Sequence, residues 1–214
     1  MAELSTARLI LCPLDPTLVL PEGHRVRVGG ATTPTSRLTD KGPAAHRETM
    51  TPMSVIDELL DNNRRYAESF VGMVPIRPAK RLAVVACMDS RIDVHGILGL
   101  HVGDAHVIRN GGGVISPDVI RSLTISQRVT GTREIILIHH TDCANLGLDE
   151  MAFKAQLQAE VGFKPDWSFD SFTDLEEDLR QSVLRLRSNP FIAYTDKIRG
   201  FIFDVATGKL AEVV

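Results

Sequence analysis

The sequence predicts an α/β fold, a single domain in which helices flank a mainly parallel central sheet. Two apolar runs, residues 82–86 and 135–138, have the length and composition of strands buried on both faces. Segments with helical spacing alternate with such runs, which is typical of parallel strands joined by crossover helices. The length of 214 residues favours a single domain, because one domain of this size buries about 70% of its unfolded surface.

The first predicted element is a helix that begins after Ser54, which can cap it with Asp57 three residues later. Apolar residues then recur at helical spacing: Ile56, Leu59, Leu60, Ala67 and Phe70. The elements expected next are a strand over 82–87, a short helix over 92–100 and a strand over 105–109. A turn over 110–113 leads to a helix with Ser116 as cap and Pro117 at its first position, running to about Thr130.

The second half continues the alternation. A strand is expected over 134–139 and a helix from about Asp149 to Val161. Thr173 and Glu176 have the spacing of a capping box, which predicts a helix that begins near Thr173 and ends before Pro190. The last predicted strand covers 200–205, with a hairpin through 207–208 to an edge segment over 209–213.

Residues 1–49 differ in character from the rest. They contain five prolines and no sustained apolar periodicity, which predicts a poorly ordered extension ahead of a folded domain over 50–214. Met50 or Met53 is the more natural start of the folded part.

Charge and composition exclude several classes of function. The net charge is −3 and there is no run of Lys or Arg, so the sequence does not predict a nucleic-acid binder. No apolar stretch approaches the roughly 20 residues of a membrane-spanning helix. Three cysteines do not make a disulfide framework, which favours the cytoplasm. The expected partners are therefore small molecules and further copies of the chain.

Two short motifs carry the chemistry: Cys87-Met88-Asp89-Ser90-Arg91 and His140-Thr141-Asp142-Cys143. Each follows a predicted buried strand. If those strands are neighbours, the thiols of Cys87 and Cys143 and the imidazole of His140 meet at one end of the sheet. Three such ligands with a fourth position open are typical of catalytic zinc, whereas structural zinc has four protein ligands.

Asp89 and Arg91 are two residues apart, so on an extended segment their side chains share one side and can meet. A guanidinium would keep the carboxylate ionised and aimed. Asp89 could then accept a hydrogen bond from a nucleophilic water or hydroxide on zinc, or serve as a fourth ligand in a resting state.

Other interpretations of these residues remain open. A single cysteine at a strand end is most often a buried apolar residue. Cys87 and Cys143 could form a redox couple, although His140 and the absence of a Cys-x-x-Cys motif make that the weaker alternative. His139 is expected on the opposite face of its strand from His140, as a packed or hydrogen-bonded histidine.

From about Met53 to its end, the chain resembles the β-class carbonic anhydrases. The resemblance lies in Cys87-x-Asp89-x-Arg91 with His140-x-x-Cys143, and in Arg109-Asn110-Gly111-Gly112, which is similar to an Arg-Asn-Ala-Gly segment common in that family. It implies zinc bound by Cys87, His140 and Cys143, and Asp89 with Arg91 as a catalytic pair. Ala144 stands where glycine usually follows the second cysteine, a departure that matters only if the position needs a positive φ.

The expected function is that of a zinc lyase, a carbonate dehydratase. Zinc-bound hydroxide would attack carbon dioxide and give bicarbonate and a proton. The alternatives are hydrolysis of carbonyl sulfide or carbon disulfide on the same fold, and a catalytically silent zinc-binding assembly protein. The resemblance also implies a homodimer or homotetramer, with the amino-terminal helix packed on the partner.

Overall fold

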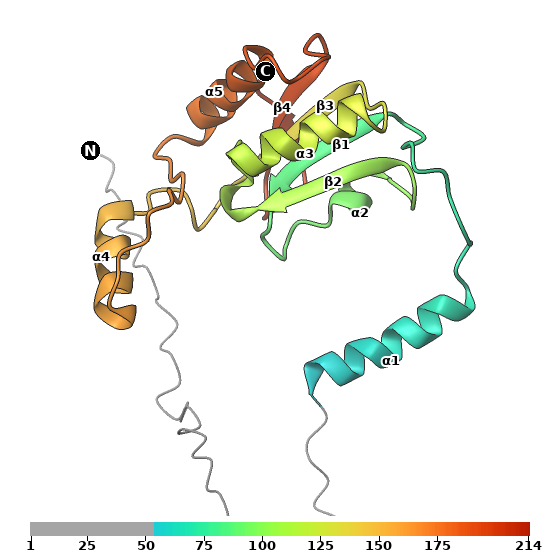
Figure 1. Ribbon diagram of the computed structural model, residues 1–214, viewed down its shortest axis with the longest axis horizontal. Helices are drawn as coiled ribbons and strands as arrows, with labels where there is room; N and C mark the ends of the chain where they lie inside the picture. Colours follow the sequence, from blue (N-terminus) through green and yellow to red (C-terminus); the bar gives the residue numbers. More distant parts are fainter. Residues whose placement is uncertain (1–53) are drawn as a thin grey trace, which may run out of the picture. The chain divides into compact units, whose positions relative to one another are not determined.

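The computed structural model describes residues 54–214, and these form a five-stranded sheet with the strand order β2-β1-β3-β4-β5 (Figure 1). The prediction of a poorly ordered extension over 1–49, and that of a domain start at residue 50, lie outside the described residues. The strands are β1 (Leu82–Cys87), β2 (Ala105–Asn110), β3 (Glu134–His140), β4 (Ile198–Phe203) and β5 (Leu210–Glu212). The helices are α1 (Val55–Glu68), α2 (Val94–Leu98), α3 (Pro117–Arg128), α4 (Glu150–Val161) and α5 (Leu175–Arg187), with a 3-10 turn η1 (Gly111–Gly113) after β2.

The centre of the sheet is parallel, as the apolar runs predict. β1 pairs in parallel with β2 and β3, β3 pairs in parallel with β4, and β5 closes the edge antiparallel to β4. Ala83 to Ala86 are fully buried, because β1 has a neighbour on each side and cover on each face. This topology confirms the mainly parallel α/β sheet.

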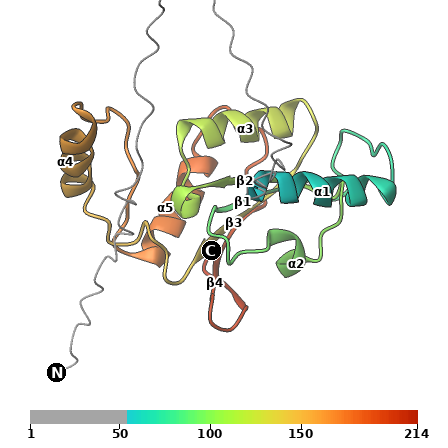
Figure 2. The ribbon, with the colours of Figure 1, turned by 90° about the horizontal axis from the view of Figure 1, so that it is seen from below.

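Two apolar layers cover the faces of the sheet. On one face, Ala83, Val85 and Leu137 pack with residues of α3 and α5, including Leu123 and Leu179. On the other face, alternate strand residues pack with a second cluster, which contains Ile92, Val94, Leu100, Cys87 and Cys143. Figure 2 shows α3 and α2 on opposite sides of the strands. The second layer is the one that reaches the two cysteine motifs.

The helix boundaries confirm one predicted cap and correct another. The side chain of Ser116 accepts from the backbone N–H of Val119, and α3 begins with Pro117. The predicted capping box of Thr173 and Glu176 is wrong, because α5 is capped by Asp174, whose side chain accepts from the N–H of Glu177. A carboxylate is a strong cap at the positive end of a helix, so the helix begins one residue later than expected.

The fourth strand covers 198–203, two residues earlier than the predicted 200–205. Ile198 pairs with Ile135 and is 1% exposed, so burial at that position starts the strand before Gly200. No helix within residues 54–214 is long and apolar enough to cross a membrane.

Candidate metal centre

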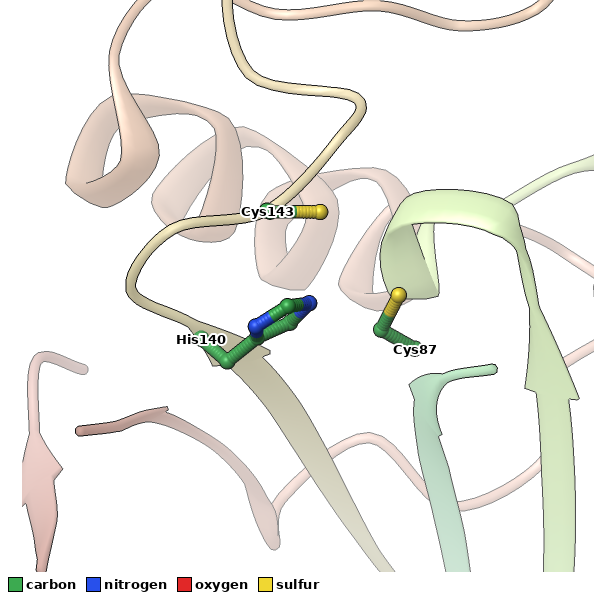
Figure 3. A group of neighbouring side chains, drawn as sticks. All are labelled: Cys87, His140 and Cys143. Carbon is green, nitrogen blue, oxygen red and sulfur yellow. The ribbon is translucent and has the colours of Figure 1, made fainter. Parts of the chain in front are cut away.

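The sheet brings the two cysteine motifs together. β1 and β3 are adjacent and parallel, so Cys87 and His140 come at the same end of neighbouring strands, and Cys143 follows in the turn after β3. The ligand atoms of these three buried residues all lie within 4.8 Å of one another, a grouping that could hold one metal ion. Figure 3 shows the three side chains directed at a common space.

His140 is oriented by its own loop. Its Nδ1 lies 2.9 Å from the carbonyl oxygen of Thr141, so Nδ1 carries the hydrogen and donates it to that oxygen. Nε2 then carries no hydrogen and presents a lone pair, and it is buried without a hydrogen-bond partner. A buried lone pair beside two thiols is costly unless something binds it, and a soft or borderline metal ion such as zinc fits this set of donors.

The pKa values of the Cys87 and Cys143 thiols are shifted in opposite directions. The hydrogen bond with Cys143 lowers the pKa of Cys87 well below that of a free thiol, against the opposing effect of burial, and the backbone N–H groups of Asp89 and Gly112 add to the lowering. The same contact with Cys87, together with burial, raises the pKa of Cys143. One thiolate therefore forms readily here, and a cation would be needed to hold the second.

The glycine turn η1 packs closely on the ends of the strands, through the backbone of Gly113. A Cβ on Gly113, which has a φ of +70°, would lie 2.9 Å from the nitrogen of Cys87 and 3.2 Å from the oxygen of Ile138. A Cβ on Gly112 would lie 2.7 Å from the side-chain nitrogen of Asn145. Close approach to the strand ends therefore requires glycine at 113, whereas at Gly112 the requirement comes from a φ of +80° and from the side chain of Asn145.

Asp89 and Arg91 do meet, but not on an extended segment. The chain turns after β1, with the N–H of Ile92 bonded to the oxygen of Asp89 at 3.1 Å. Arg91 grips the carboxylate in a two-pronged arrangement, Nε to Oδ1 at 2.9 Å and Nη2 to Oδ2 at 2.7 Å. These bonds from Arg91 hold the pKa of Asp89 well below its usual range. Oδ2 of Asp89 lies 3.9 Å from Nε2 of His140, which places the carboxylate beside the three-residue cluster.

Two charged residues at this site were not among the predicted site residues. Arg109 donates from Nε to the oxygen of Cys87 at 2.9 Å and from Nη2 to the oxygen of Asp89 at 2.6 Å, which ties β2 to the turn after β1. Asp142 accepts from Arg91 through its side chain and its carbonyl oxygen. The signals were available, since Arg109 begins the Arg-Asn-Gly-Gly segment and Asp142 lies between two predicted ligands.

The backbone after β3 resolves the question raised by Ala144. Within residues 54–214, the non-glycine residues with positive φ are Arg81, Asp142 and Asp170, so Ala144 is not in the conformation that would require glycine. The left-handed position is Asp142, at φ 57°. Asp is among the residue types that tolerate this conformation best.

His139 is a packed, hydrogen-bonded histidine, as predicted. It is fully buried, its Nε2 lies 2.7 Å from Oδ2 of Asp178 on α5, and its ring stacks on Phe172. It is therefore engaged away from the three-residue cluster that contains its neighbour His140.

Known proteins share both the fold and the motifs. A family model described as carbonic anhydrase matches residues 82–167. The chain is 55% identical over 161 residues to Beta-carbonic anhydrase 1 of Mycobacterium tuberculosis, which covers 75% of this chain and 99% of that protein. It is 34% identical over 152 residues to a carbon disulfide hydrolase of Acidithiobacillus thiooxidans, covering 61% of this chain and 76% of that one. The crystal structure of carbonic anhydrase from Streptococcus mutans superposes with a TM-score of 0.72 at 40% identity, covering 77% of this chain and all of the other.

Proposed function

Because the chain belongs to the β-carbonic anhydrase family, we propose that it catalyses the reversible hydration of carbon dioxide to bicarbonate and a proton. One observation carries the proposal. The buried, unpartnered Nε2 of His140 lies between two thiols and 3.9 Å from a carboxylate that Arg91 holds in its ionised form. A purely structural metal site has no need of that carboxylate.

We propose that Cys87, His140 and Cys143 hold a zinc ion and leave one position open. Their identity supports this, since two thiolates and one imidazole are a known catalytic zinc ligand set. A zinc ion bound there supplies a Lewis acid that makes water nucleophilic near neutral pH. The hydrogen bond from His140 Nδ1 to the Thr141 oxygen fixes the tautomer that leaves Nε2 free to bind a metal.

Asp89 and Arg91 act on the reacting water. The carboxylate of Asp89 accepts a hydrogen bond from it and turns its lone pair toward the carbon of carbon dioxide. Arg91 keeps Asp89 ionised and holds it in place with two parallel bonds. Arg109 fixes the carbonyl groups of Cys87 and Asp89, so the metal-binding strand end and the catalytic carboxylate move as one unit.

Stopped-flow hydration of carbon dioxide, measured with a pH indicator on zinc-loaded protein, tests this function. The wild-type protein should be active, and Asp89→Asn should keep its zinc yet lose about 100-fold or more in kcat/KM. The matched control is Asp166→Asn, which removes the same charge from an exposed residue outside the site. Full activity of Asp89→Asn would remove Asp89 from the mechanism.

Carbon disulfide and carbonyl sulfide are the rival substrates. The chain is also similar to the carbon disulfide hydrolase of A. thiooxidans, although less so than to Beta-carbonic anhydrase 1. Both should be assayed beside carbon dioxide with the same protein. Turnover of a sulfur compound with no hydration of carbon dioxide would overturn the proposal in favour of a hydrolase. A zinc-loaded protein inert toward all three would be a silent metal-binding protein.

We further propose that the chain forms a homodimer, alone or paired into a tetramer. No residue of α1 is buried, and the apolar side chains of Ile56, Leu59 and Leu60 are each more than half exposed. Such a face is stable in water when a second copy covers it. Sedimentation should give twice or four times the chain mass. The variant Leu59→Asp should lower the measured mass, whereas Asn63→Asp on the same helix should leave it unchanged. A monomeric parent protein would contradict this proposal.

We place the protein in the cytoplasm. Cys87 and Cys143 are both free thiols in the structure, and a reducing compartment keeps such a pair able to bind metal. Fractionation of cells that produce the protein at native levels tests the compartment.

A further inference from the structure

We infer that Asp142 is a positioning residue for the Asp89 and Arg91 pair, an inference that rests on the proposed function. Asp142 lies between His140 and Cys143, and its side-chain Oδ2 accepts from Nη1 of Arg91 at 2.7 Å. Its carbonyl oxygen accepts from Nη2 of the same guanidinium at 2.9 Å. One residue of the metal-binding loop therefore holds Arg91 at two points.

These contacts complete the environment of Arg91. Nε and Nη2 face the carboxylate of Asp89, and Nη1 with the remaining hydrogen of Nη2 faces Asp142. Four of the five guanidinium hydrogens are thereby engaged. The two carboxylates occupy different edges of the guanidinium, so Asp142 anchors Arg91 without displacing Asp89.

The anchor is needed because Arg91 is otherwise loosely held. Its side chain is 44% exposed, and a long exposed side chain has many rotamers available. Without Asp142, the hydrogen bonds left to the guanidinium within residues 54–214 are those to Asp89, and the two side chains could move together. Asp89 already lies 3.9 Å from Nε2 of His140, close to where an ion held by the cluster would sit.

The backbone conformation explains why one residue can do this. At φ 57°, Asp142 turns the chain between the two proposed ligands and presents its side chain and its carbonyl oxygen to the same guanidinium. Thr141, the residue before Asp142, orients the imidazole, since its carbonyl oxygen accepts from Nδ1 of His140. The two residues between the ligands therefore orient one group each: Thr141 orients the imidazole, and Asp142 orients the pair that acts on water.

The consequence concerns the open position. Asp142 keeps Arg91 in place, and Arg91 keeps Asp89 off the metal. Loss of the Asp142 side chain shifts Asp89 toward the open position as a competing ligand, which excludes other anions from it.

The test is azide binding to the cobalt(II)-substituted protein, followed by its visible spectrum. Asp142→Gly keeps the left-handed backbone and removes the side chain, whereas Asp142→Asn keeps the backbone and a neutral acceptor. We expect the azide Kd to rise about three- to fivefold in Asp142→Gly, the upper end of what an exposed ion pair contributes, and less in Asp142→Asn. The melting temperature should change by no more than about 2 °C, since the side chain of Asp142 is 79% exposed.

Two controls separate positioning from general damage. Asp170→Gly alters another aspartate with positive φ, and its azide Kd should stay within about twofold of wild type. In an Asp89→Ala background, Asp142→Gly should have no further effect on azide binding, because the competing ligand is gone.

An unchanged azide Kd in Asp142→Gly, or an effect that persists without Asp89, would overturn the inference. Failure of the wild-type protein to bind cobalt at all would instead overturn the proposed metal centre. The two failures are therefore distinguishable.

Discussion

The glycine turn beside the proposed metal centre allows a quantitative prediction for Gly113→Ala. A Cβ at this position would lie 2.9 Å from the backbone nitrogen of Cys87 and 3.1 Å from the carbonyl carbon of Ala86. Both atoms belong to β1, so neither can rotate away as the end of a flexible side chain could. The substitution must displace the strand end that carries Cys87, or displace η1 itself.

The expected cost has two parts. An alanine in the left-handed conformation costs about 1 kcal/mol. Moving packed backbone to relieve the contacts adds about 1–3 kcal/mol, as overpacking does in cores. We expect the free energy of unfolding to fall by about 3 kcal/mol in all, and the melting temperature by roughly 6–12 °C in a domain of this size.

Gly147→Ala is the matched control. Gly147 has a φ of +74°, and a Cβ added there would have no other atom within 4 Å, so this variant carries the backbone cost alone. Urea and thermal unfolding of both variants and the parent should be measured in chelator at one protein concentration, because the proposed metal and the proposed dimer would each raise the apparent stability. If Gly113→Ala were as stable as Gly147→Ala, the close packing of η1 on β1 could not be the reason for glycine at this position.

Two further predictions concern buried and titrating polar groups. Gln127 on α3 accepts from the N–H groups of Ala193 and Tyr194, so Gln127→Ala should lower the free energy of unfolding by about 2–4 kcal/mol. The control Gln181→Ala, at an exposed position, should change it by less than about 0.5 kcal/mol. Equal losses of the two variants in urea denaturation would contradict the reasoning. The N–H of Ala206 and the hydroxyl of Thr207 lower the pKa of Asp204, so the wild-type protein should be more stable than Asp204→Asn at pH 7. The stability advantage of the wild-type protein over Asp204→Asn should shrink below about pH 4, because the carboxylate becomes protonated as the pH falls through its lowered pKa in the folded protein. A difference in melting temperature between the two proteins that stayed constant down to about pH 3 would contradict this role of Asp204.

Much of the fold could be predicted from the sequence because local and tertiary signals agree. The apolar run of β1 requires cover on both faces, and Ser116 with Pro117 marks the start of α3 in both sequence and structure. The convergence of Cys87, His140 and Cys143 also followed from a general rule, since the ends of neighbouring parallel strands meet at one edge of a sheet.

The errors arose where two local signals compete or where the contact is long-range. Thr173 and Asp174 both suit a helix cap, and the structure uses the carboxylate. The turn after β1 brings Asp89 and Arg91 together by a hydrogen bond between Asp89 and Ile92, which no alternation pattern predicts. The contact between Asp142 and Arg91 spans 51 residues of sequence, and residue spacing does not predict such a contact.

The proposal that Cys87, His140 and Cys143 hold one zinc ion is tested most directly by zinc content together with X-ray absorption at the zinc edge. The wild-type protein should contain one zinc per chain, with two sulfur neighbours at about 2.3 Å and lighter atoms at about 2.0–2.1 Å. His140→Gln should lose the metal, while His139→Gln should keep it, because His139 is bonded to Asp178. A metal-free wild-type protein, or a His140→Gln variant that still held one zinc per chain, would contradict the account.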